Sequence, residues 1–316
     1  MKTKGILSFI LKTLLVSAVM LVVTSVISMV RPLSAGESTA RDEGTIMLLL
    51  FIVTTVYALV IGLVVHNARG SRLQLIVGLI VAFYGVQTVV GQIEAFFFLT
   101  PMGEHMGAGS APVLQMPLDF ILSQLIVWGS VTAVGVPLAV LLFDKRKKHL
   151  RKPITFLPAW TGKQWLVRIA VVVVAYELLY FGFGYFVAWK DPAVQEFYQG
   201  SDPGSFWLQI RQVATKTPGL YGLQAFRALL WMGITFPVIA MLRKKGWTGA
   251  FITALFVSLP MNIPHIIPNP YMPAEVRAVH FAETVSSTFI FGIVLFLLFA
   301  STPKKNQIET DQTLTQ

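Results

Sequence analysis

Six ionisable side chains lie within long apolar segments of this sequence or close to their ends. They are Glu94, Glu177, Arg227, Arg277, His280 and Glu283. An ionisable group at the centre of a membrane helix costs at least about 2–3 kcal/mol on insertion scales, so such residues usually serve a function. We therefore predict that these six side chains line one polar cavity, and that this cavity is the candidate functional site.

The last apolar segment carries much of this chemistry on one helical face. Its polar residues are Arg277, His280, Glu283, Thr284 and Ser287, which recur at spacings of three and four. Residues at these spacings are neighbours on the surface of a helix. The pattern predicts a polar stripe at one end of an otherwise apolar helix.

A purely structural role is the first of three interpretations. Buried charges in proteins are usually paired. Arg227 would then neutralise Glu94 or Glu177, and Arg277 would take a second acid. Because three deep acids face one deep arginine, pairing alone leaves an excess of carboxylates.

Translocation or sensing of a small or lipidic substrate is the second interpretation. A carboxylate near the middle of its span, such as Glu177, can carry a proton, and His280 with Glu283 would form a relay towards the outside. Transporters often place broken helices at their binding sites. Pro260 and Pro264 are expected to break the end of the seventh apolar segment.

A metal-dependent hydrolase acting at the outer leaflet is the third interpretation. His280, Glu283 and Glu94 could supply imidazole and carboxylate ligands to a divalent ion, and His265 or His105 would complete the set. The ion would activate a water molecule. A divalent metal is the one cofactor that the sequence leaves open. The chain has no cysteine, which excludes disulfides and thiolate metal sites.

Eight apolar segments have to position these residues. The chain of 316 residues is 55% hydrophobic and only 13% charged. Apolar runs of about 18 residues or more are typical of membrane-spanning helices. The predicted spans cover residues 6–30, 46–65, 73–99, 118–143, 165–189, 220–242, 247–266 and 279–300. We therefore predict an all-α polytopic membrane protein, a bundle of about eight spans forming a single domain over residues 1–303, with a polar tail over 304–316.

The basic residues give the predicted bundle an orientation. With the amino terminus in the cytoplasm, sixteen of the 25 Lys and Arg residues fall on the cytoplasmic side and six on the outer side. Cytoplasmic loops carry such an excess of positive charge. We therefore expect both termini to be cytoplasmic, in the inner membrane of a bacterium. The net charge of +10 is then a topology signal, and we expect no nucleic acid partner.

One basic loop could have a further role. Residues 145–152 carry six Lys and Arg residues, which could bind anionic lipid headgroups. Retention of the loop in the cytoplasm explains the same charges. Apart from the lipid bilayer itself, the sequence indicates no particular partner.

Short helices are expected on the outer face. Asp191 and Asp202 each stand directly before a proline, as a capping acid does before the first helical position. The stretch 190–219 therefore predicts two short helices lying in the membrane interface. Five prolines in the stretch 260–275 predict a stiff, extended segment there.

Overall fold

The spans of this bundle are visible in a computed structural model of the chain. It describes residues 3–30, 43–100, 116–146, 153–244, 246–269 and 271–300. Within these ranges eight helices are long and apolar enough to cross a membrane. The prediction of an all-α polytopic membrane protein is confirmed.

Five of the spanning elements are single α-helices and three contain a change of helix type. The single helices are α1 (Thr3–Val30), α2 (Glu43–His66), α6 (Leu118–Phe143), α10 (Gly219–Met241) and α12 (Ala274–Phe299). The third span joins α3 (Arg72–Tyr84), the π-helix η1 (Gly85–Val89) and α4 (Val90–Leu99). The fifth joins α7 (Gly162–Phe183) and the π-helix η3 (Gly184–Ala188), and the seventh joins α11 (Gly246–Asn262) and the 3-10 helix η4 (Ile263–Ile266).

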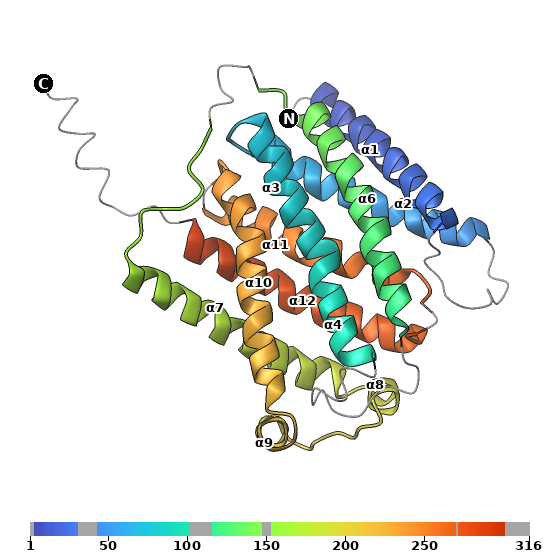
Figure 1. Cartoon of the computed structure of the whole chain (residues 1–316), viewed down its shortest axis with the longest axis vertical. Helices are drawn as coiled ribbons and strands as arrows, with labels where there is room; N and C mark the ends of the chain where they lie inside the picture. Colours follow the sequence, from blue (N-terminus) through green and yellow to red (C-terminus); the bar gives the residue numbers. More distant parts are fainter. Residues whose placement is uncertain are drawn as a thin grey trace, which may run out of the picture.

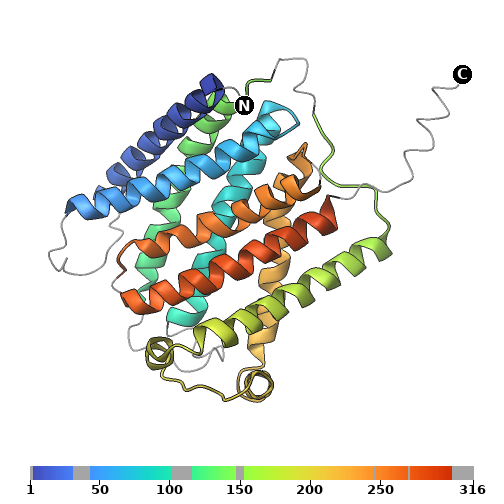
Figure 2. The same ribbon diagram turned by 180° about the vertical axis from the view of Figure 1, so that it is seen from behind.

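Two short helices lie at one end of the bundle. They are α8 (Pro192–Phe197) and α9 (Phe206–Lys216), within the stretch for which two short helices were predicted. Figures 1 and 2 show α8 and α9 at one end, called the α8–α9 face below, with the start of α1 and the end of α12 at the opposite end. The chain therefore begins and ends its path through the bundle on the same side.

Of the two acids predicted to cap these short helices, one does so and the other does not. Asp191 caps α8, because its side chain accepts a hydrogen bond from the backbone of Ala193 and Pro192 follows at the first helical position. The predicted cap Asp202 does not start α9. Ser205 does so, and Asp202 instead accepts a hydrogen bond from Lys190 at 2.8 Å.

The proline-rich stretch is less extended than predicted. Helix α11 continues through Pro260 to Asn262, and η4 follows with Pro264 inside it, so the prediction was wrong for residues 260–266. Close packing holds this region against α12. A Cβ atom on Gly292 would lie 2.7 Å from Cα of Ala254, so only glycine lets the two helices approach this closely.

Candidate functional site

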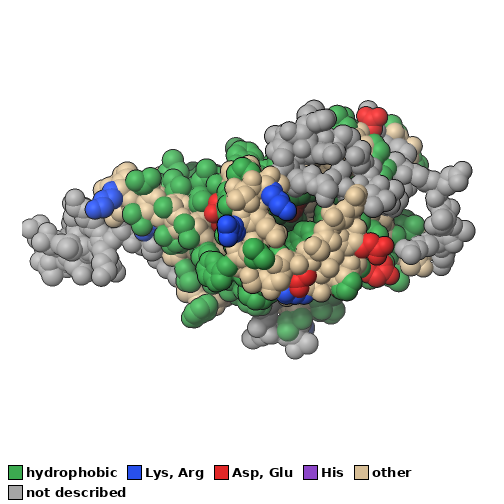
Figure 3. Space-filling view, turned by 90° about the horizontal axis from the view of Figure 1, so that it is seen from below, with side chains coloured by type: hydrophobic (Ala, Val, Ile, Leu, Met, Phe, Trp, Pro, Cys, Tyr) green, Lys and Arg blue, Asp and Glu red, His purple; other side chains and the backbone are tan. Residues whose placement is uncertain are grey.

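A cavity of about 1250 Å³ lies between the helices next to the α8–α9 face. The exposed residues Ser201 and Lys216 belong to its lining, so it reaches the surface there. Figure 3 looks onto this face, where Lys and Arg side chains gather near the centre. Sites for drug-sized ligands usually measure about 300–1,000 Å³, so the space suffices for a somewhat larger molecule.

The cavity is confined to one half of the bundle. Seven of the eight spanning helices line it only with residues from the half nearer the α8–α9 face, and α12 lines it to just beyond its middle, at Phe291. The deepest lining residues are Leu50, Gln87, Trp128, Tyr176, Arg227 and Phe291. Beyond this level the helices are packed with buried apolar side chains, including Leu79, Trp231, Val238 and Phe256. In this conformation the cavity is therefore open to one face and closed towards the other.

An ion pair between α10 and α4 lies deep in the cavity. Arg227 Nη2 donates to Glu94 Oε2 at 2.6 Å, and Nη1 donates to Glu94 Oε1 at 3.2 Å and to Gln224 Oε1 at 3.0 Å. The rings of Tyr176 and Tyr180 lie 5.7 and 5.9 Å from the guanidinium carbon. The Arg227 side chain is 3% exposed and the Glu94 side chain 27%. The acid therefore shields the base from the cavity.

A second polar chain joins α12 to α8. The Nδ1 atom of His280 lies 2.9 Å from Glu283 Oε2, and its Nε2 atom lies 3.3 Å from the hydroxyl of Tyr198. Burial raises the pKa of the Tyr198 phenol, which lies outside the spans, so the phenol stays protonated and can donate to Nε2. One neutral tautomer, with its proton on Nδ1, then satisfies both hydrogen bonds. The result is a hydroxyl–imidazole–carboxylate chain on the cavity wall.

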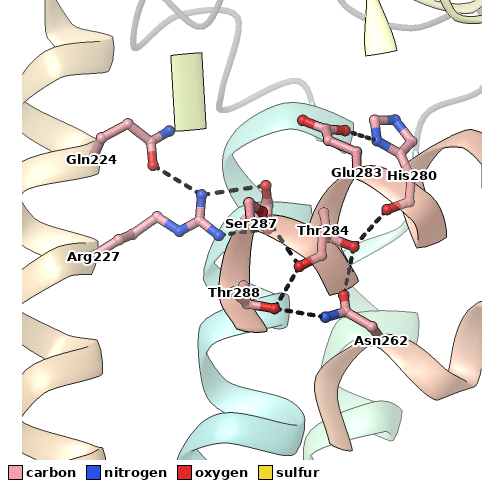
Figure 4. Close-up of polar contacts among 9 residues, drawn as sticks. Gln224, Arg227, Asn262, His280, Glu283, Thr284, Ser287 and Thr288 are labelled. Carbon is pink, nitrogen blue, oxygen red and sulfur yellow. Dashed lines mark hydrogen bonds and ion pairs between the residues drawn. The ribbon is translucent and has the colours of Figure 1, made fainter. Parts of the chain in front are cut away.

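Asn262 fixes the end of α11 against this part of α12. Its side-chain nitrogen donates to Ser258 O at 2.8 Å and to Thr288 Oγ1 at 3.2 Å, and its oxygen accepts from Thr284 Oγ1 at 2.6 Å. Figure 4 shows the contacts of Asn262 with Thr284 and Thr288, together with the His280–Glu283 pair and the Arg227–Gln224 pair. Asn262 is fully buried, so this network sets the register of α11 against α12.

Five of the six predicted cavity residues lie in the cavity lining: Glu94, Arg227, Arg277, His280 and Glu283. Arg277 ties the start of α12 to the preceding loop, because Nε donates to His265 O and Nη1 to Met272 O, both at 3.1 Å. Glu177 is absent from the lining and lies partly exposed on α7. Glu177 lies at the same depth as the cavity, but its side chain is on a face of α7 that does not line the cavity.

The proposed metal ligands do not converge. In the part of the chain that the structure describes, no group of three His, Cys, Asp or Glu residues could hold a metal ion. Glu94 is bound by Arg227, His280 and Glu283 are bound to each other, and His265 contacts the backbone oxygen of Asn262 at 2.9 Å. His280, Glu283, Glu94 and His265 therefore form no such group among the described residues, and metal binding stays a prediction. His105 lies outside the described residues.

Sequence reasoning missed two residues of this site. Tyr198 follows a short surface helix, and nothing in the local pattern indicates that it reaches the His280 ring of α12. Asn262 stands between Pro260 and Pro264, where the sequence suggested a broken helix end. The available signal was the amide side chain of Asn262 itself, which stands in an otherwise apolar segment. In the structure α11 continues to this residue and buries it.

The basic loop is described only at its start. Arg146 Nε donates to Asp144 Oδ1 at 2.7 Å, and Arg146 Nη1 donates to Gly70 O at 3.0 Å. These contacts hold Arg146 against the bundle. Residues 147–152 lie outside the described residues, so anionic lipid binding by residues 145–152 stays a prediction.

Comparisons of the chain with known protein families, with curated proteins and with solved structures find no match. What the protein does has to be inferred from the geometry of its own cavity.

Proposed function

We propose that this integral membrane protein binds a small amphipathic molecule in its cavity, as the first step of translocating or sensing it. One observation carries the proposal. The deep polar side chains of α4, α10 and α12 converge on a single cavity that reaches one face and is closed towards the other. A buried polar site of this size, with aromatic walls and few charged groups, is typical of ligand binding.

We also propose that the α8–α9 face is the outer face of the cytoplasmic membrane. The excess of Lys and Arg in the loops of the opposite face supports this orientation. The substrate would then enter from outside or from the outer leaflet of the membrane.

Gly91 offers a direct test of occupancy. It lines the cavity, and a Cβ atom added to it would meet no atom within 4 Å. A Gly91→Phe substitution therefore places an aromatic ring in the cavity, and its Cβ atom meets no neighbouring helix. Gly233 is a matched control, since it also has open space around it but lies exposed on α10, outside the lining.

The measurement is native mass spectrometry of the protein released from micelles of a neutral detergent. We expect a noncovalent adduct on the wild-type protein and on Gly233→Phe, and its loss from Gly91→Phe. An adduct that persists in Gly91→Phe would place the bound molecule elsewhere. A wild-type protein without any adduct, and without binding of the ions tested below, would refute the proposed function.

A further inference from the structure

Of the two residues in the deep ion pair, Glu94 is the one whose side chain faces the cavity. Its side chain is 27% exposed, whereas that of Arg227 is only 3% exposed and already donates to Glu94 and Gln224. A molecule in the cavity therefore meets the carboxylate before it meets the guanidinium. This end of the cavity presents the carboxylate oxygens of the ion pair as hydrogen-bond acceptors.

Glu283 supplies a second carboxylate that is only half satisfied. Its side chain is 10% exposed and its Oε2 atom is paired with His280. None of the described residues donates a hydrogen bond to Oε1, which is therefore free to bind a ligand. A Cβ atom on Gly184 would lie 3.6 Å from Oε1, so the glycine leaves the space beside this oxygen open. A buried carboxylate oxygen is stabilised when it receives a donor or a positive charge.

The walls next to these acids are aromatic. Tyr180, Trp189 and Tyr198 line the cavity together with Glu94 and Glu283. Aromatic faces attract a cation within about 6 Å of the ring centre. The Arg227 guanidinium already lies at such a distance from Tyr180, so this wall accommodates one cation in the folded protein.

Arg277 and Lys216 keep their charges but lie nearer the α8–α9 face than the two acids. Two nitrogens of Arg277 are bound to backbone oxygens of the loop before α12. Lys216 is exposed at the rim, where water and salt screen its charge. In the deep part of the cavity, the carboxylates of Glu94 and Glu283 outnumber the guanidinium of Arg227.

We propose that the cavity selects organic cations, and that the protonated amine or quaternary ammonium group of the bound amphipathic molecule lies against Glu283 and Glu94. This assignment rests on the proposed function and adds the chemical class of the ligand. The apolar body of the molecule would occupy the aromatic part of the cavity.

Two ions of similar shape and opposite charge test this proposal. Tetraphenylphosphonium and tetraphenylborate are titrated into the purified protein in a neutral detergent, and binding is followed by isothermal titration calorimetry against micelles alone. We expect saturable binding of tetraphenylphosphonium, at least about tenfold tighter than that of tetraphenylborate. Glu283→Gln should weaken cation binding by about tenfold or more, and Glu283→Asp should restore part of it.

Glu177→Gln is the matched control, because it removes a carboxylate at similar depth that lies outside the lining. It should leave cation binding unchanged, whereas Gly91→Phe should abolish it. Equal or tighter binding of tetraphenylborate, or equal losses in Glu283→Gln and Glu177→Gln, would overturn the charge assignment. If Gly91→Phe abolished the binding of tetraphenylborate, the proposed binding of a ligand in the cavity would still stand. Binding of neither ion by the wild-type protein would overturn both.

Discussion

Removing Glu94 and removing Arg227 break the same ion pair, but we expect them to lower the free energy of unfolding by different amounts. Glu94→Gln leaves a positive charge on a side chain that is 3% exposed, with the oxygens of Gln224 and of the new amide as its acceptors. Arg227→Met leaves a carboxylate that is 27% exposed to the cavity, where water can solvate it or a proton can neutralise it. Losing the acid should therefore cost more than losing the base.

The structure sets the approximate magnitudes. Removing one partner of a buried pair costs about 3–5 kcal/mol, and Glu94→Gln should lie near about 3 kcal/mol because the new amide oxygen still accepts one hydrogen bond. Arg227→Met should cost about 1.5 kcal/mol, the lower end for a lost hydrogen bond to a charged group. The double variant leaves no unpaired charge, so its stability should lie within about 1 kcal/mol of the wild type.

The assay is reversible unfolding in mixed micelles with increasing sodium dodecyl sulfate, which gives the free energy of unfolding for all four proteins. Two results would refute the reasoning. One is a larger loss for Arg227→Met than for Glu94→Gln. The other is a double variant whose loss equals the sum of the single losses, since the two side chains would then not interact.

Two further predictions concern the α8–α9 face. The chain has no native cysteine, so Ser201→Cys carries a single thiol at the rim of the cavity. A membrane-impermeant maleimide added to intact cells should label it, and labelling only after lysis would reverse the proposed orientation. The hydrogen bond from Lys190, followed by that from the Gly204 backbone, lowers the pKa of Asp202. Its small stabilising contribution is therefore present above the unfolded pKa of about 3.9 and is lost as the pH falls through the lower folded value. Melting curves of wild type and Asp202→Asn should differ slightly at neutral pH and converge in acid, and a difference that persisted in acid would count against the Lys190 contact.

The spans could be predicted because the membrane imposes a local requirement. A helix must offer about 20 apolar residues to cross the hydrocarbon core, and this length is readable wherever it occurs. The eighth span shows the limit of the approach. Its polar first turns made the sequence place the start at residue 279, while the helix begins at Ala274. Prolines were also misleading, because Pro260 lies inside α11.

The polar stripe of the last span could also be predicted from a short stretch of sequence. Arg277, His280, Glu283 and Ser287 all line the cavity, because spacings of three and four fix which side chains share a helical face. Such periodicity determines a face relative to its own helix. It does not determine which neighbour that face meets.

The choice of partners was decided only by tertiary structure. The sequence offered Arg227 two acids at similar depth, and the fold pairs it with Glu94, 133 residues away, while Glu177 lies outside the cavity. The rotation of α4, α7 and α10 about their own axes makes this choice, and that rotation depends on the packing of the whole bundle. Tyr198 reaches His280 for the same reason, since α8 is brought over α12 by the fold. The sequence by itself therefore determined the spans and the depth of each ionisable group. The packed bundle decided which groups meet, because side-chain contacts between helices depend on neighbours that are distant in the chain.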